Sequence, residues 1–208
     1  MSAMVNGSDH KSTHENLDSR RPSEYKIVDQ LFHPSTGHHY LILYSNIESM
    51  REAYSSYIKR QMEEEPDSVI LFLSYYDTTE NIRTTLQSKG IQVKELEKTG
   101  SIIILDIVKV LDNPFFEIPD IERLRELTRK LEIQFKDKTI FVIADMSVFH
   151  HLNKTSELLE YEKNLHKDIK IERWKELCMY HKSDFQIMFT NEEANQLKEY
   201  HKDRIIMV

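Results

Sequence analysis

The run VILFL at residues 69–73 is a continuous apolar segment of strand length. Such a run predicts a strand that is covered on both faces, which is typical of a parallel sheet. The run TIFVIA at residues 139–144 has the same character and ends at Asp145. These two segments therefore predict the centre of a buried, mostly parallel sheet.

Apolar runs alternate with amphipathic stretches on both sides of these two segments. Further strands are predicted at residues 39–44, 91–93, 101–110, 174–180 and 204–208. Helices are predicted from residue 45 to Pro66, from 77 to Gly90, from Pro119 to 131, from 155 to 169 and from 190 to 200. This repeated strand–helix order favours the doubly wound α/β class, with helices on both faces of the sheet.

Three of the predicted helices begin with the spacing of a capping box, in which a polar residue is followed three positions later by Glu. The pairs are Ser45 with Glu48, Asp77 with Glu80, and Thr190 with Glu193. We therefore expect Ser45, Asp77 and Thr190 to be the N-caps of these helices.

The composition is that of one globular domain. The chain has 208 residues, of which 39% are hydrophobic and 30% are charged, and this is enough to bury a continuous core. Residues 1–24 are polar and lack periodicity, so we expect a flexible N-terminal tail there. Residues 25–208 are predicted to form the single domain.

The charge and the cysteine count exclude several classes of protein. A net charge of −7 supplies no broad basic surface for nucleic-acid phosphates, so no direct contact with nucleic acid is expected. The single cysteine, Cys178, excludes an internal disulfide and indicates a reducing compartment. The sequence lacks a signal peptide and a membrane-spanning run, and we expect a cytoplasmic protein without membrane contact.

The turn after the first predicted strand reads YSNIESMR at residues 44–51. A phosphate-binding loop would read GxxxxGK[ST] there, because glycine N–H groups wrap the phosphates and Lys supplies positive charge. Without glycine or lysine in this turn, we predict no ATP hydrolysis by this route and no cofactor. Asp145 stands where such ATPases hold a metal ion, but a helix cap or a loop anchor is the favoured interpretation.

Neither the histidines nor Cys178 show the spacing of a metal site. The pairs His38–His39 and His150–His151 flank predicted strand ends, and neighbouring residues on a strand point to opposite faces. We therefore predict solvated loop histidines and no metal site. Cys178 lies in an apolar strand and is predicted to be a buried structural residue, with a redox sensor as the alternative.

Ligands of open α/β sheets bind beyond the carboxyl ends of the strands. Five residues that follow or face those ends are predicted to line a ligand site: Tyr44, Asp145, Tyr161, Glu162 and Tyr180. None of them is predicted to be catalytic. Tyr161 and Glu162 are adjacent on a predicted helix and lie about 100° apart, so at most one can point squarely into the crevice. The alternative is that the tyrosines pack the sheet edge and that Glu162 pairs with Lys163 or Lys167.

Five segments carry a family resemblance by their order and spacing. They are GHHYLILYSNIESM from residue 37, ADMS from 144, ELLEYEKNLH from 157, ELCMYHKSDF from 176 and LKEYHKDRIIMV from 197. Together they resemble the MEDS domain, the methanogen/methylotroph DcmR-type sensory domain. The resemblance implies a RecA/KaiC-like core that has lost its nucleotide-binding loop and serves as a sensor of small organic compounds. The matching positions are Tyr44, Asp145, Ser147, Glu160, Tyr161, Glu162, Cys178 and Tyr180.

Three functions are consistent with these features. The leading prediction is a non-catalytic sensory or signal-transduction module that binds a small organic ligand and acts through a signalling or regulatory protein. The second is a degenerate ATPase fold that serves in protein interaction or homo-oligomerisation without a ligand. The third is an enzyme that uses Asp145, Glu160 or Glu162 with a divalent metal, and the missing phosphate loop counts against it.

Overall fold

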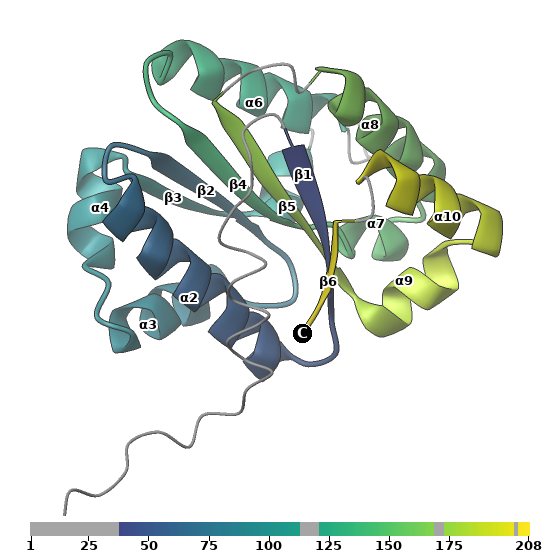
Figure 1. Ribbon diagram of the computed structural model, residues 1–208, viewed down its shortest axis with the longest axis horizontal. Helices are drawn as coiled ribbons and strands as arrows, with labels where there is room; N and C mark the ends of the chain where they lie inside the picture. Colours follow the sequence, from purple (N-terminus) through teal and green to yellow (C-terminus); the bar gives the residue numbers. More distant parts are fainter. Residues whose placement is uncertain (1–37, 113–120, 169–172, 202–203) are drawn as a thin grey trace, which may run out of the picture.

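The computed structural model describes residues 38–112, 121–168, 173–201 and 204–208. The predicted tail at residues 1–24 and the predicted helix start at Pro119 lie outside the described residues. The described part of the chain forms a six-stranded sheet in which every pairing is parallel, with helices on both faces (Figure 1). The doubly wound α/β prediction is confirmed.

The strands lie in the spatial order β3-β2-β4-β5-β1-β6. Their bounds are β1 His38–Tyr44, β2 Val69–Ser74, β3 Ile102–Asp106, β4 Ile140–Asp145, β5 Trp174–His181 and β6 Ile205–Met207. Strand β1 lies between β5 and β6, so the two ends of the described domain are neighbours in the sheet. This arrangement brings residues that are far apart in the sequence to one place.

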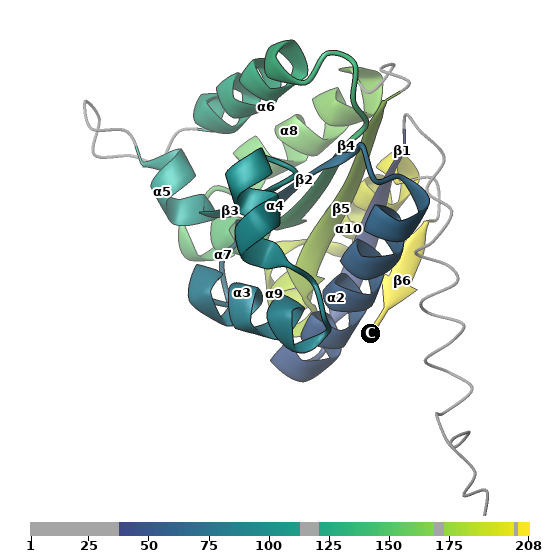
Figure 2. The same cartoon turned by 90° about the vertical axis from the view of Figure 1, so that its left-hand side faces the viewer.

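Nine helices connect the strands within the described residues. Their bounds are α2 Ile47–Glu64, α3 Thr79–Ser88, α4 Val93–Thr99, α5 Ile107–Leu111, α6 Glu122–Gln134, α7 Val148–His151, α8 Thr155–Asp168, α9 Lys182–Met188 and α10 Asn191–Tyr200. Helices α2, α3 and α4 cover one face of the sheet, which we call the α2 face. Helices α6, α8 and α10 cover the opposite face, which we call the α8 face (Figures 1 and 2).

The side chains of β2 show why its sequence is continuously apolar. Ile70 and Phe72 pack in the core of the α2 face, whereas Leu71 and Leu73 pack in the core of the α8 face. All six residues of this strand are buried. A strand that is covered on both sides needs an apolar residue at each position, because successive side chains point to opposite faces.

Two of the predicted N-caps are wrong by one residue. Asn46 caps α2 in place of Ser45, and its side chain accepts the N–H three residues ahead at 2.9 Å. Thr78 caps α3 in place of Asp77, with the same type of bond at 3.1 Å. The carboxylate of Asp77 is instead paired with Arg51 at 2.8 Å, and this pair anchors α2 to the end of β2.

The predicted strand at residues 91–93 is wrong. Gly90 has a φ of +85°, which is the left-handed conformation that ends a helix, and the chain turns there after α3. Val93 then begins α4, and Val93 and Leu96 of this helix pack against the α2-face core. The segment Ile91-Gln92-Val93 is too short to distinguish a strand from the start of a helix, so the sequence pattern was ambiguous here.

The predicted strand at residues 101–110 is divided into a strand and a helix. Strand β3 ends at Asp106, whose carboxylate accepts the N–H of Val108 at 2.9 Å and so begins α5. The predicted capping box of Thr190 and Glu193 is confirmed at the start of α10. Side-chain caps therefore decide where these elements begin and end.

Candidate functional site

Tyr44 and Asp145 meet at the edge of the sheet where the strands end. The Tyr44 hydroxyl donates a hydrogen bond to Asp145 Oδ2 at 3.0 Å, although β5 lies between β1 and β4. The N–H groups of Tyr76 and Ser147 also donate to the Asp145 carboxylate, at 3.1 and 3.2 Å. Asp145 is thus the loop anchor that the sequence favoured, and it holds the carboxyl ends of β1 and β4 to the turn after β2.

Burial dominates the electrostatics of this pair. The Asp145 carboxylate is 1% exposed, and burial raises its pKa to about 6 in spite of the donors around it. Burial, followed by the charge of Asp145, also raises the pKa of the Tyr44 hydroxyl far above its usual value. Tyr44 therefore stays protonated as a donor, and Asp145 is the member of the pair that changes charge near neutral pH.

Tyr76 extends this edge of the sheet to the molecular surface. Its hydroxyl donates to Asp184 Oδ2 at 2.6 Å and lies 3.0 Å from His151 Nε2. The residue is 38% exposed, and Tyr75 packs beside both Tyr76 and His151, with ring centroids 5.1 and 5.2 Å away. We call the following residues the carboxyl-edge cluster: Tyr44, Tyr76, Asp145, His151 and Asp184.

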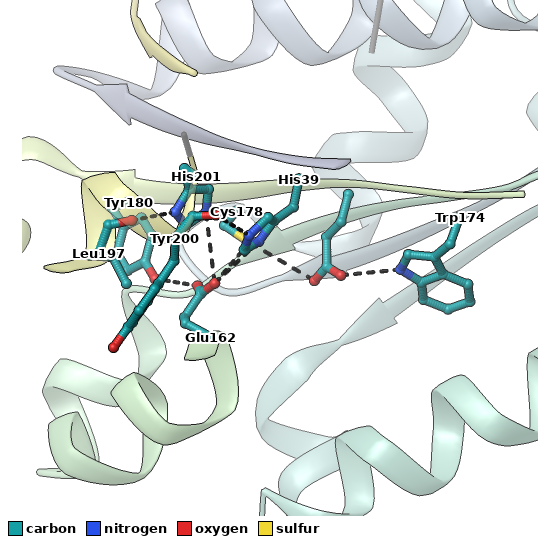
Figure 3. A network of polar contacts seen from close by, with 9 residues as sticks. His39, Glu162, Trp174, Cys178, Tyr180, Leu197, Tyr200 and His201 are labelled. Carbon is teal, nitrogen blue, oxygen red and sulfur yellow. Dashed lines mark hydrogen bonds and ion pairs between the residues drawn. The ribbon is translucent and has the colours of Figure 1, made fainter. Parts of the chain in front are cut away.

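A second polar group is buried on the α8 face of the sheet (Figure 3). It consists of His39 on β1, Glu162 on α8, Cys178 on β5 and His201 at the end of α10. One nitrogen, oxygen or sulfur atom from each residue lies within 4.8 Å of the others, and all four residues are buried. We call these four residues the buried tetrad.

One oxygen of Glu162 lies close to the other three residues of the buried tetrad. Glu162 Oε2 is 3.4 Å from His39 Nδ1, 3.7 Å from His201 Nε2 and 3.7 Å from Cys178 Sγ. The other oxygen, Oε1, accepts a hydrogen bond of 2.6 Å from the Tyr180 hydroxyl. The two imidazole rings are stacked, with centroids 3.9 Å apart. Helix α8 thus presents a fully buried carboxylate to two strands and to the end of α10.

Burial and neighbouring charges act in opposite directions on the buried tetrad. Burial raises the pKa of Glu162, but the hydrogen bond with His39 and the charges of His201 and His39 outweigh it, and the pKa falls to about 2. Burial lowers the pKa of His39, but its contacts with Glu162 outweigh this effect and the pKa rises. Burial and the Glu162 charge raise the pKa of Cys178 well above its usual value. An ionised Glu162 therefore favours positive charge at the centre of the tetrad.

Glu176 borders the tetrad on β5. Its Oε1 lies 4.0 Å from Cys178 Sγ, and its Oε2 accepts a hydrogen bond of 3.2 Å from the indole N–H of Trp174. Burial, followed by the charge of Glu162, raises the pKa of Glu176 to about 7. The pKa of Glu176 is therefore raised and that of Glu162 is lowered, although the two carboxylates share one buried region.

The five residues predicted to line one ligand site lie on both faces of the sheet. Tyr44 and Asp145 are joined at the carboxyl edge, and Tyr44 packs in the α2-face core. Tyr180 and Glu162 are joined on the α8 face, where Tyr161 is also buried in the core. The expectation that all five share one crevice is therefore wrong. The side chains alternate along each strand, so residues near the same edge can point to opposite faces.

Other expectations for individual residues are also corrected. Glu162 is buried and contacts the tetrad and Tyr180, whereas Lys163 is exposed, so the predicted pairing with Lys163 is wrong. Glu160 is exposed on α8, whereas Glu162 and Asp145 are buried. His39 is 3% exposed on β1 and is not a solvated loop residue.

Sequence reasoning found Cys178 as a buried residue but missed most of the polar partners in both clusters. Tyr76 follows a predicted strand end, and the rule that selected Tyr44 could also have selected it. Asp184 and His201 carried no such signal. Asp184 lies in a segment that we did not assign to a helix, and His201 becomes relevant only because α10 ends beside β1.

Comparison with solved structures defines the class of this protein. The chain is similar to a KaiC-like protein from the hyperthermophilic archaeon Pyrococcus horikoshii, with a TM-score of 0.54, 14% identity, and coverage of 78% of this chain and 68% of that chain. The protein is thus an α/β domain with a KaiC/RecA-like fold, and the turn after β1 lacks the glycines and lysine of a phosphate loop.

The family model of the methanogen/methylotroph, DcmR sensory domain (MEDS) matches residues 38–199. The chain therefore belongs to the MEDS family, as the sequence resemblance predicted. A comparison with curated proteins gives no match. Membership of this family indicates a sensory or signalling role. None of the helices among the described residues has the length and apolar character needed to cross a membrane.

Proposed function

We propose that this domain senses a small organic molecule at the carboxyl-edge cluster and passes the signal to a partner protein without catalysing a reaction. The observation that carries the proposal is the position of Tyr76. Its backbone N–H donates to the buried Asp145, while its partly exposed side chain bonds Asp184 at the surface. A molecule that engages Tyr76 from solvent therefore acts on groups tied directly to the sheet.

The chemistry of the cluster supports a small organic ligand. Tyr75, Tyr76 and His151 provide aromatic faces, and the Tyr76 hydroxyl, the His151 imidazole and the Asp184 carboxylate provide donors and acceptors. Binding sites for small molecules typically combine aromatic and apolar walls with a few placed polar groups. A phenol or an alcohol could replace the Tyr76 hydroxyl as the donor to Asp184, since the two groups have the same hydrogen-bonding character.

The same contacts supply a route for the signal. Tyr76 joins the turn after β2 to α9 through Asp184, and it joins α7 through His151. Helix α9 also carries Ile187, which is 71% exposed. A ligand that displaces the Tyr76 hydroxyl from Asp184 would release α9 from β2, and a partner that contacts α9 would then detect binding.

The proposed absence of catalysis is supported by the turn after β1. This turn has neither the glycines nor the lysine with which a P-loop binds phosphates, and Asp145 is already bonded to Tyr44. We expect no turnover of ATP by the purified protein. An ATPase activity that Asp145→Asn abolishes would refute this part of the proposal.

Ligand-observed saturation-transfer NMR with a panel of phenols, aromatic alcohols and short aliphatic alcohols tests the binding site. We expect members of the panel to bind the wild type, and Tyr76→Ala to weaken their binding by about 1–3 kcal/mol, or roughly 5- to 150-fold. Ile133→Ala is the matched control, because Ile133 is 78% exposed on α6 and has no part in the cluster. Ligands that bind Tyr76→Ala as well as they bind wild type would place the site elsewhere, and a panel without binders would refute this ligand class.

The alternative function is protein interaction or homo-oligomerisation without a ligand. Met207 on the edge strand β6 is 66% exposed, and Ile187 on α9 is 71% exposed, so apolar groups are available outside the carboxyl-edge cluster. Native mass spectrometry separates the two functions, since it reports the oligomer mass and any retained small molecule together. A stable oligomer whose mass contains no ligand, together with no binder in the NMR panel, would favour the alternative.

A further inference from the structure

The buried tetrad has no role in the function proposed above. Its four side chains come from β1, α8, β5 and the end of α10, and all four are buried. A polar cluster of this kind is costly to bury unless its groups are satisfied by partners or by a metal ion. The composition of the tetrad, with two imidazoles, one carboxylate and one thiol, is a set of groups that bind transition metals.

The distances in the tetrad are close to those around a tetrahedral metal ion. Zinc bonds of about 2.0–2.3 Å place neighbouring ligand atoms roughly 3.3–3.7 Å apart. Glu162 Oε2 is 3.4 Å from His39 Nδ1 and 3.7 Å from both His201 Nε2 and Cys178 Sγ. The distance from Cys178 Sγ to His39 Nδ1 is 4.0 Å. All ligand atoms of the tetrad lie within 4.8 Å of one another, but the two imidazole rings are stacked with centroids 3.9 Å apart. A zinc-centred tetrahedron therefore requires the two rings to turn apart, so that their lone pairs converge on the ion.

The outer contacts of the tetrad orient its ligand atoms inward. His39 Nε2 lies 3.1 Å from the carbonyl oxygen of Tyr200, and His201 Nδ1 lies 2.8 Å from that of Leu197. A carbonyl oxygen only accepts, so these two outer nitrogens carry the protons. The lone pairs of the neutral rings are then on His39 Nδ1 and His201 Nε2, the two atoms that face Glu162. Metal-binding histidines are usually held in this way by a bond from the outer N–H.

The carboxylate is oriented by the same principle. The Tyr180 hydroxyl donates to Glu162 Oε1 at 2.6 Å, which leaves Oε2 directed at His39, His201 and Cys178 (Figure 3). Two neutral imidazoles, one carboxylate and one thiolate have a total charge of −2, which a divalent cation neutralises. The buried tetrad therefore has inward-facing ligands, fixed outer partners and a matching charge.

We infer that His39, Glu162, Cys178 and His201 bind one Zn²⁺ ion. Nitrogen, oxygen and sulfur ligands in a tetrahedral arrangement suit this borderline-soft ion, and four protein ligands define a closed structural site. Binding forms the zinc–sulfur bond and releases the Cys178 proton to solvent. The ion joins the end of α10 to β1, β5 and α8, so zinc couples the C-terminal part of the domain to the sheet.

Cobalt substitution of the full chain provides the test, because tetrahedral Co²⁺ reports both geometry and sulfur ligation in its absorption spectrum. The chelator-treated protein is titrated with Co²⁺ and then with Zn²⁺. We expect one equivalent of Co²⁺ to give tetrahedral visible bands and a thiolate-to-cobalt charge-transfer band, and one equivalent of Zn²⁺ to remove both. Cys178 is the single cysteine of the chain, so the charge-transfer band identifies it without any variant.

Three variants assign the remaining features of the site. Cys178→Ser should abolish the charge-transfer band, and Tyr180→Phe, which frees Glu162 Oε1, should weaken Zn²⁺ binding by about 10- to 100-fold in competition with a chromophoric chelator. His150→Gln is the matched control, since this partly buried histidine on α7 is outside the tetrad and should leave both readouts unchanged.

Wild-type protein that takes up Co²⁺ without a thiolate band would refute the inference, because other histidines of the chain would then account for the uptake. Equal loss of affinity in His150→Gln and Tyr180→Phe would also refute it. If Cys178→Ser does not fold, the wild-type spectrum alone decides. The ligand panel described above is independent of this result, because the carboxyl-edge cluster and the buried tetrad share no residue.

Discussion

The buried carboxylate of Asp145 should make the stability of the domain depend on pH in a defined direction. Burial raises its pKa from 3.8 to about 6, and this difference corresponds to about 3 kcal/mol. The folded pKa is higher than the unfolded one, so the unfolded state loses its proton first as the pH rises. The contribution of Asp145 is therefore most favourable below its ordinary pKa and is lost as the pH rises through about 6.

The Asp145→Asn variant isolates this effect, because Asn does not ionise. Between about pH 5 and pH 8, the wild type should lose about 1–1.5 kcal/mol of unfolding free energy relative to the variant. Urea denaturation at several pH values, followed by the fluorescence of the single tryptophan, Trp174, measures both free energies. Other titrating groups contribute equally to both proteins, so they cancel in the difference.

The Tyr44 hydroxyl provides a second check on the same reasoning. It donates to Asp145 Oδ2, and its bond lowers the pKa of that carboxyl. Tyr44→Phe should therefore raise the pKa of Asp145 further and move the loss of stability to higher pH. Unfolding free energies of wild type and Asp145→Asn that run parallel from about pH 5 to pH 8 would refute the assignment of a raised pKa to Asp145.

Four further outcomes follow from the structure. Cys178 should react slowly with a thiol reagent in the native protein and quickly in urea, because it is fully buried and its pKa is raised; rapid stoichiometric labelling of the native state would favour a redox role. Gly90→Ala should lower the unfolding free energy by about 1–2 kcal/mol through its φ of +85° alone, since an added Cβ has no heavy atom within 4 Å; an unchanged denaturation midpoint would contradict this. Thr190→Ala should cost about 1 kcal/mol in the same assay, because it removes the hydroxyl that accepts the Glu193 N–H and donates to the Glu193 carboxylate, and a stability equal to wild type would show that the cap is dispensable. Phe72→Ala should cost about 3–5 kcal/mol, because the ring is 1% exposed and packs edge-on against Tyr54, and a smaller loss would mean that the core closes around the cavity.

Local patterns in the sequence were sufficient for most elements of the fold. Strands β2 and β4 were recognisable because a strand that is buried on both faces must be apolar at every position. The start of α10 was recognisable because Thr190 and Glu193 satisfy the helix end by themselves. Residues 91–93 were not, because the choice between strand and helix there depends on how Val93 packs against the sheet.

The candidate sites depended far more on tertiary structure. The sequence placed Tyr44 and Asp145 at the carboxyl edge, because residues that follow parallel strands gather at one edge of the sheet. It also predicted that Glu162 and Tyr180 line a ligand site, but it could not assign their face of the sheet or their partners. That assignment depends on the register of β5 against β1 and on the rotation of α8 about its axis.

The sequence by itself determined the fold class, the positions of the buried strands β2 and β4, and the absence of a phosphate loop after β1, since each of these follows from neighbouring residues. Only the tertiary structure determined the buried tetrad. His39 and His201 come from opposite ends of the described domain, and they stack because β1 is inserted between β5 and β6, beside the end of α10. Non-local pairing of strands brings His39 and His201 together, and the local periodicity of a sequence does not encode such a pairing.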